Sequence, residues 1–263
     1  MTTRNDRYVN AWLDTYRAAG ASPGTVAVRS SHIERLARHG NLLSNTTRDL
    51  QAFLMQYRHL APESRKSMTE SVRLFYRWAV LEGLIDVSPA DGLRRVRAPR
   101  GVPRPIPQHA LRAALALADD ETTLMILLGA YAGLRRAEIA RVHSDDVDGL
   151  AITVTGKGGV RRRVPIHPML AGRLARINGW AFPSPRRPGE HVTPDYVSDR
   201  LGRVMPAPYT PHSLRHYFAT AAYRGTHNLR AVQQLLGHAS PTTTALYTLV
   251  DEDDMTAAVE SVA

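Results

Sequence analysis

Hydrophobic residues recur three or four positions apart through the first third of the chain, which indicates amphipathic helices. The longest such stretch runs through Met68, Val72, Phe75 and Ala79. Glycine or proline interrupts the pattern at residues 20–24, 40, 62 and 83, where helices are expected to stop or start. The pattern predicts a bundle of about four helices over residues 1–88.

The pattern of the second half mixes helices with one pair of strands. Helices are predicted over residues 108–118, 121–132, 193–204, 211–224, 227–236 and 241–249. Residues 150–155 and 160–166 instead alternate in polarity, and the glycine-rich residues 156–159 between them are typical of a β-hairpin turn. The expected fold is therefore mainly α with a small β-hairpin, arranged as a helical bundle followed by an α+β domain.

Residues 91–107 follow neither pattern. They contain four prolines, two glycines and five arginines, which leave no periodicity on which an element could form. An extended linker is expected here, and Arg94, Arg95 and Arg97 are expected to lie against phosphate groups. A plain solubilising connector is the alternative.

The charge of the chain points to a polyanionic partner. Lysine and arginine total 34 against 24 aspartate and glutamate, which gives a formal net charge of +10. Nucleic acid is expected rather than a membrane, because no basic amphipathic helix stands out. The alternative is a high isoelectric point shared by the other proteins of the same cell.

Several classes of function are excluded by composition. The chain has no cysteine, which rules out a disulfide scaffold, a thiolate zinc site and a cysteine nucleophile, and fits the cytoplasm as the expected location. No apolar run approaches the roughly 20 residues of a membrane span. The polar N-terminus is unlike a signal peptide.

Two segments of the second half carry basic groups in positions where they could bind an anion. Arg135 follows a glycine that would let another backbone come close, and its guanidinium could grip two oxygens of one phosphate. A surface arginine near a helix end is the alternative. His212 and Arg215 lie three residues apart in the first turn of a predicted helix, where backbone N–H groups also favour an anion.

The same helix and the one after it hold further candidates. His212 and His216 have the spacing of a metal pair, but no third ligand completes a site, so no metal is expected and His216 is interpreted as a core or supporting residue. The residues expected to face the core are Leu214, Phe218 and Ala221. His238 follows a predicted helix stop, and Tyr247 lies on the next short helix, where a tyrosine taken alone would be interpreted as packing.

Taken together, these segments resemble the tyrosine recombinase family, which includes phage integrases and Xer-type resolvases. The resemblance is carried by residues 132–139, 156–158, 212–220 and 236–238, followed nine residues later by Tyr247. It implies that the chain cuts and rejoins DNA without a cofactor, and that Tyr247 is the nucleophile. It also implies that the scissile phosphate is surrounded by Arg135, Lys157, His212, Arg215 and His238.

The chemistry agrees with these implied roles. Two arginines can neutralise the charge that develops on the nonbridging oxygens of the phosphate. A tyrosine with an ordinary pKa of about 10 needs a base, and His212 is suited to take its proton. The leaving oxygen needs an acid; arginine hardly deprotonates, and Lys157 is one of only two lysines. His238 is expected to donate a hydrogen bond to a nonbridging oxygen of the phosphate. Glu138 is expected to orient Arg135, and Arg161 to contact DNA.

The resemblance also assigns each part of the chain. Residues 1–90 are expected to form a helical, core-binding DNA-binding domain, 91–107 a basic linker, 108–250 the catalytic domain, and 251–263 an acidic tail. An arm-binding domain of the kind that many phage integrases carry is not expected, which favours a simple recombination site. An apolar stripe in the tail predicts that it either folds back on its own domain or docks on a neighbouring protomer.

The predicted function is site-specific DNA recombination through a 3′-phosphotyrosine intermediate and a Holliday junction. The expected partners are double-stranded DNA with inverted half-sites, an accessory directionality factor, and further copies of the chain, which would be a monomer when free and a homotetramer on DNA. A type IB topoisomerase-like enzyme is one alternative. A non-catalytic DNA-binding regulator is the other, and the presence of all six reactive residues speaks against it.

Overall fold

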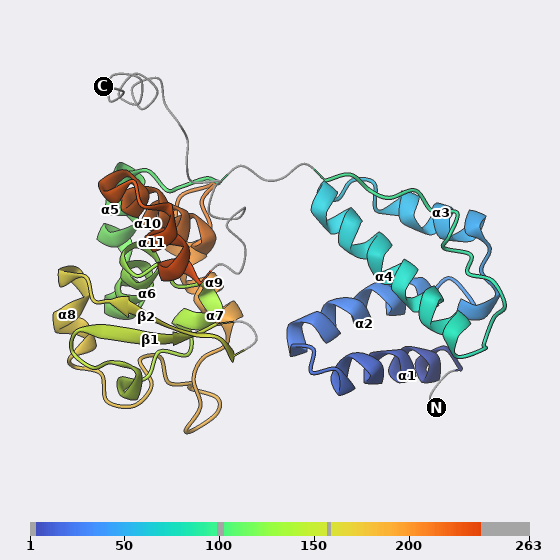
Figure 1. Ribbon diagram of the computed structural model, residues 1–263, viewed down its shortest axis with the longest axis horizontal. Coiled ribbons are helices and arrows are strands. Elements are labelled where there is room, and N and C mark those ends of the chain that lie inside the picture. Colours follow the sequence, from blue (N-terminus) through green and yellow to red (C-terminus); the bar gives the residue numbers. More distant parts are fainter. Residues whose placement is uncertain (1–3, 99–102, 157–158, 238–263) are drawn as a thin grey trace, which may run out of the picture. The chain divides into compact units, whose positions relative to one another are not determined.

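The computed structural model describes residues 4–98, 103–156 and 159–237. They form two compact units, divided between residues 101 and 102, and each unit is described by itself (Figure 1). The division falls inside the segment predicted as a linker. In the described parts of that segment, residues 93–98 and 103–107 form neither helix nor strand.

The N-terminal unit is a helical bundle, as the hydrophobic pattern predicts (Figure 1). Its elements are α1 (Arg4–Ala18), α2 (Pro23–Ala37), the short 3₁₀ helix η1 (Leu42–Ser44), α3 (Thr47–Gln56) and α4 (Pro62–Leu81). The helix starts are encoded locally. Ser22 caps α2 by accepting from the backbone N–H of Thr25, and Thr46 forms a capping box with Asp49 at the start of α3.

Aromatic side chains fill the core of this unit. The rings of Trp12 and Phe75 meet edge to face with their centroids 5.5 Å apart. The fully buried Tyr76 donates its hydroxyl to the carbonyl of Leu42 at 2.7 Å. Leu93 is buried in the same core, and its carbonyl accepts from Arg73, so the first residues of the predicted linker belong to the N-terminal unit.

The C-terminal unit is also mainly helical and contains the one sheet of the described residues, so the predicted fold class is confirmed. Its elements are α5 (Gln108–Leu117), α6 (Asp120–Tyr131), α7 (Arg136–Ile139), η2 (Ser144–Asp146), β1 (Ala151–Thr155), β2 (Arg161–Pro165), α8 (Pro168–Leu174), α9 (Pro194–Val204), α10 (Pro211–Thr226) and α11 (Leu229–Leu236). Elements α7, η2 and α8 were not predicted from the sequence. The helix predicted over residues 241–249 lies outside the described residues.

Helix α6 is the centre of the C-terminal unit. Seven of its consecutive residues, 124–130, are buried, and it packs against α8, α9 and α10 (Figure 1). Strands β1 and β2 pair antiparallel from Ala151 with Pro165 to Thr155 with Arg161. Beyond the ladder, the N–H of Gly156 donates to the carbonyl of Val160 at 2.8 Å. Within the part of the chain that is described, no helix is long and apolar enough to cross a membrane.

Candidate active site

The turn between α6 and α7 places Arg135. Gly133 has a φ of +65°, which glycine adopts without strain, and a Cβ at this position would lie 2.5 Å from the ring of Phe218. The turn directs the chain into α7, with Arg135 as the residue that precedes the helix. The glycine was expected from the sequence to let another backbone come close. The close approach is instead made by an aromatic side chain of α10.

Glu138 is the third residue of α7, and it is the hub of the site, meaning the carboxylate to which the arginines bind. Its carboxylate, 4% exposed, accepts from the backbone N–H of Arg135 at 2.8 Å and from that residue's Nη1 at 2.9 Å. Arg162 of β2 binds both carboxylate oxygens, at 2.9 and 2.8 Å. Nη1 of Arg215, on α10, lies 3.7 Å away. Glu138 therefore orients Arg135, as predicted, and binds two further arginines that are distant in sequence.

The pKa of Glu138 reflects these contacts. Burial by itself would raise it, but hydrogen bonds from Arg162 and Arg135 and the positive charges of Arg162 and Arg215 hold the pKa below its ordinary value of 4.5. The carboxylate is therefore ionised at neutral pH. Because the folded-state pKa is lowered, its contribution to stability is present above pH 4.5 and is lost as the pH falls through the lowered value.

We expect Glu138→Ala to lower the free energy of unfolding by about 3–5 kcal/mol, because the buried arginines would lose their counter-charge. Urea denaturation at pH 7 measures the change. Glu190→Ala is the matched control, since Glu190 forms an exposed ion pair with Arg187 and its loss should cost about 0–1 kcal/mol. Equal losses in the two variants would contradict the role of Glu138 as the hub.

Arg215 is fully buried in this structure. Its Nη1 donates to the carbonyl of Gly133 and its Nη2 to the carbonyl of Leu236, each at 2.6 Å. The side chain thus joins α10 to the ends of α6 and α11. Direct contact between Arg215 and a phosphate stays a prediction. Of the residues expected to face the core, Leu214 is buried and Phe218 partly buried, but Ala221 is exposed, because the buried stripe runs through Ala219 instead.

His212 and His216 lie against each other on α10, with ring centroids 4.3 Å apart. Burial, followed by the cations of Arg215 and Arg135, lowers the pKa of His212 below 6.5. Burial, His212 and Arg215 lower the pKa of His216 to about 4. Both rings are therefore neutral at pH 7, and His212 can accept a proton. The described residues include no group of three side chains that could hold a metal ion.

Arg135 and His212 open onto one cavity. It has a volume of about 400 Å³ and is lined by Arg135, Arg136, Ser198, Thr210, Pro211 and His212. The side chain of Arg135 is 37% exposed, and Arg136 is held beside it by Asp195 at 3.1 Å and Ser198 at 3.0 Å. The cavity also borders the start of α10, where the positive end of the helix dipole favours an anion. This arrangement can bind a phosphate group and places a base, His212, where it can accept the proton of an attacking hydroxyl.

The other predicted site residues divide into two groups. Lys157, His238 and Tyr247 lie outside the described residues. The four arginines predicted to contact DNA are described, and all are exposed: Arg94, Arg95, Arg97 and Arg161. Their accessibility permits contact with a duplex, and the contact itself stays a prediction.

Arg162 was not among the site residues predicted from the sequence. The alternation of residues 160–166 predicted a strand, but only Arg161 of this strand was singled out, whereas Arg162 lies two residues before the buried Val164. The two residues therefore point to the same, inner face of the strand, and the side chain of Arg162 is only 7% exposed. The alternation itself was the signal for a buried arginine.

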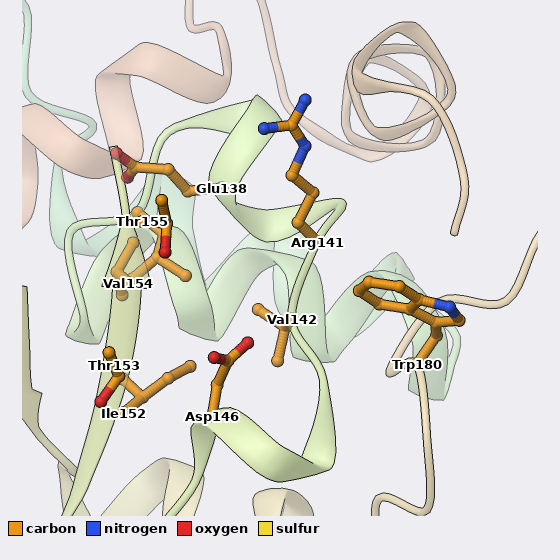
Figure 2. Close-up of a pocket in the computed structure, with 10 residues that line it drawn as sticks. Glu138, Arg141, Val142, Asp146, Ile152, Thr153, Val154, Thr155 and Trp180 are labelled. Atoms are coloured by element: carbon orange, nitrogen blue, oxygen red, sulfur yellow. The ribbon is translucent and has the colours of Figure 1, made fainter. Parts of the chain in front are cut away.

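A second cavity borders Glu138 on another side, between β1 and the segment that runs from α7 to η2 (Figure 2). Figure 2 shows Glu138 and Trp180 at opposite ends, with Asp146 between Val142 and the strand. Trp180 donates its Nε1 to the carbonyl of Gly189 at 2.9 Å. No sequence motif pointed to this cavity, because its walls come from segments with no pattern in common.

Comparisons with known proteins identify the family of the chain. Residues 106–253, more than half of the chain, match the model of the phage integrase family. The tyrosine recombinase XerC of Xylella fastidiosa (strain M23) is 31% identical over 235 residues, covering 81% of this chain and 79% of XerC. The tyrosine recombinase XerA of Thermococcus kodakarensis is 30% identical over 260 residues, covering 92% and 90%.

The fold is shared with lambda integrase. A crystal structure of its residues 75–356, a dimer bound to a COC′ core site, covers 90% of this chain and 96% of that chain with a TM-score of 0.75 at 20% identity. The chain belongs to the phage integrase family and is a tyrosine recombinase, an enzyme of DNA strand breakage and rejoining.

Proposed function

We propose that this chain is a site-specific DNA recombinase, an integrase that works through a 3′-phosphotyrosine intermediate and a Holliday junction. One observation carries the proposal. Arg135 and Arg215, which lie far apart in sequence, both lie against Glu138, and His212 lies near the charges of these two arginines. The segment that matches the family contains all six proposed reactive residues. A degenerate DNA-binding regulator would not need to keep that set.

In the proposed cleavage step, the phenolic oxygen of Tyr247 attacks the phosphorus in line and the bond to the 5′-oxygen breaks. His212 takes the phenolic proton, which its lowered pKa allows because the ring is neutral at pH 7. Lys157 gives a proton to the leaving 5′-oxygen. Arg135, Arg215 and His238 stabilise the charge on the nonbridging oxygens. A 5′-hydroxyl from the partner strand reverses the step, so no cofactor is consumed.

The proposed substrate is double-stranded DNA with two inverted half-sites. Residues 1–90 and the linker 91–107 would bind the half-site, with Arg94, Arg95 and Arg97 on phosphates, while residues 108–250 cut it. Arg161 would contact the same duplex. Free protomers would assemble into a homotetramer on DNA in the cytoplasm, with an accessory directionality factor. A solved structure with the same fold is a lambda integrase tetramer bound to a Holliday junction.

The test incubates the protein with the attachment DNA of the genetic element that encodes it. Recombinant products and Holliday junctions are expected, together with a covalent adduct at the 3′ end. Supercoiled plasmid without the site should not be relaxed. Relaxation of any supercoiled DNA without recombination would favour the topoisomerase alternative, and binding without an adduct would favour a regulator.

The fall of the cleavage rate at low pH should report the protonation of His212. Because its neutral form is the active one and its pKa is lowered, single-turnover cleavage should persist below pH 6.5 and then fall as the ring protonates. His212→Asn should lose about 10²- to 10⁴-fold in rate together with that acid limb. His109→Asn, on the exposed side of α5, is the control and should leave the profile unchanged. An acid limb that survives in His212→Asn would contradict the assignment.

The acidic segment 251–263 is proposed to dock on a neighbouring protomer and to couple assembly to cleavage. Its net charge is poorly suited to lie on DNA, and its apolar stripe needs a partner surface. Deleting it should leave single half-site binding intact, weaken cooperative binding to the full site and stop recombination. A truncated protein that binds full sites cooperatively and recombines normally would contradict this role.

A further inference from the structure

The guanidinium of Arg162 is bound on both of its edges. Nη1 and Nη2 donate to the two carboxylate oxygens of Glu138, at 2.9 and 2.8 Å, in a bidentate pair. Nε donates to the carbonyl of Leu235 at 2.8 Å. The side chain therefore joins its own strand, β2, to α7 and to the last turn of α11.

The last turn of α11 is held by two arginines. The carbonyls at a helix end have no partner inside the helix, and a cation there is favourable. Arg162 binds the carbonyl of Leu235, and Arg215 binds that of Leu236. Gly237, which follows in a left-handed conformation, leaves no spare room: a Cβ there would lie 3.0 Å from Cδ of Arg162. The end of α11 is therefore fitted to the stem of Arg162.

Each of the three joined segments leads to a proposed reactive residue. Strand β2 follows the hairpin turn that contains Lys157. Glu138 holds Arg135 by its backbone and its side chain. The last residue of α11, Leu236, lies two residues before His238, and the chain continues to Tyr247. Arg162 and Arg215 each contact both Glu138 and the end of α11, and of these two Arg162 is the one on the hairpin.

We infer that Arg162 is a positioning residue for strand cleavage: it fixes Arg135, through Glu138, relative to the hairpin strand and to the point where the chain leaves α11. The inference rests on the proposed function and adds a residue to it. Lysine could not replace Arg162, because one ammonium group cannot reach both carboxylate oxygens and the carbonyl of Leu235 in the same geometry.

Arg162→Met and Arg162→Lys test the inference, with Arg163→Met as the matched control. Arg163 is the next residue of the strand, is exposed, and pairs with Asp148 rather than with the site. Single-turnover adduct formation on half-site DNA should fall about 10²-fold in both Arg162 variants, as expected when a reacting group is displaced by about 1 Å. Half-site affinity should change little, and Arg163→Met should match the wild type.

A second readout separates positioning from a loss of stability. His212 faces the cations of Arg135, Arg136 and Arg215 and the ring of His216. Without Arg162, the negative charge of Glu138 is balanced by fewer cations and attracts Arg135 and Arg215 more strongly. Because these two cations then lie closer to Glu138 and farther from His212, the pKa of His212 should rise toward 6.5. NMR titration of the free protein measures this without DNA. Partial unfolding would lower the intensity of the native His212 signal without moving the midpoint of its titration.

The inference is overturned if folded Arg162→Met forms the adduct as fast as Arg163→Met, or if its His212 midpoint is unchanged. If Arg162→Met does not fold, Arg162→Lys carries the same test. Full recovery of the rate in an Arg162→Met, Glu138→Gln double variant would also overturn it, because Arg162 would then act only as a counter-ion. If the wild type forms no adduct, the proposed function fails, and the His212 titration still decides the role of Arg162.

Discussion

Tyr247→Phe is expected to abolish the covalent protein–DNA adduct while leaving DNA binding nearly unchanged. The substitution removes one hydroxyl oxygen, which is the proposed nucleophile, and keeps the aromatic ring. Without that hydroxyl, the proposed phosphotyrosine bond cannot form. Denaturing gel electrophoresis of the protein with labelled half-site DNA measures the adduct, and a mobility-shift titration measures binding.

Tyr223→Phe is the control for this experiment. Tyr223 lies on α10 and is partly buried, with its ring against His227, so the substitution also removes one tyrosine hydroxyl from the C-terminal unit but not from the proposed site. It should form the adduct at the wild-type yield. An adduct that persists in Tyr247→Phe at that yield would assign the nucleophile to another residue.

Lys157→Ala should slow cleavage by about 10²- to 10⁴-fold, the usual contribution of a general acid. The reason lies in the leaving group: a 5′-oxygen needs a proton as its bond to phosphorus breaks, and a 5′-sulfur does not. DNA with sulfur at the bridging 5′ position should therefore restore most of the rate of Lys157→Ala. Single-turnover cleavage of the two substrates, by wild type and variant, measures the rescue.

Lys157→Arg is the sharper variant at this position. It keeps the positive charge on the hairpin turn but holds its proton too tightly to transfer it, so it should also cleave slowly and should also be rescued by sulfur. Lys66→Arg, in the N-terminal unit, changes the other lysine of the chain and should have no effect. If the sulfur substrate is cut as slowly as normal DNA by Lys157→Ala, Lys157 has a role other than proton donation.

The described part of the site is a network of arginines held by one carboxylate. Arg135 is the member that opens onto the cavity, whereas Arg162 and Arg215 are buried and bind backbone carbonyls at the end of α11. Such a network fixes the orientation of the exposed arginine before a phosphate arrives, which lowers the cost of ordering it on binding. It also explains why Glu138 should matter for stability as well as for cleavage.

The helices and the hairpin could be predicted because their signals are local. The predicted start of α10 at residue 211 and the predicted end of α11 at residue 236 match the structure, because the caps at Thr210 and Gly237 depend only on residues within one turn. Strand alternation around residues 156–159 predicted β1 and β2 to within one residue. The missed helices α7 and α8 have four and seven residues, too few for a hydrophobic period to emerge.

The sequence by itself determined the two-part helical organisation, the hairpin and the family, because each depends on short-range patterns or on motifs in a fixed order. Only the tertiary structure decided which basic groups are buried, which one faces the cavity and which carboxylate binds them. The contacts that decide this join residues 24, 73 and 82 positions apart: Arg162 with Glu138, Arg162 with Leu235, and Arg215 with Gly133. A local pattern carries no record of such partners, since burial and pairing are set by the packing of whole elements.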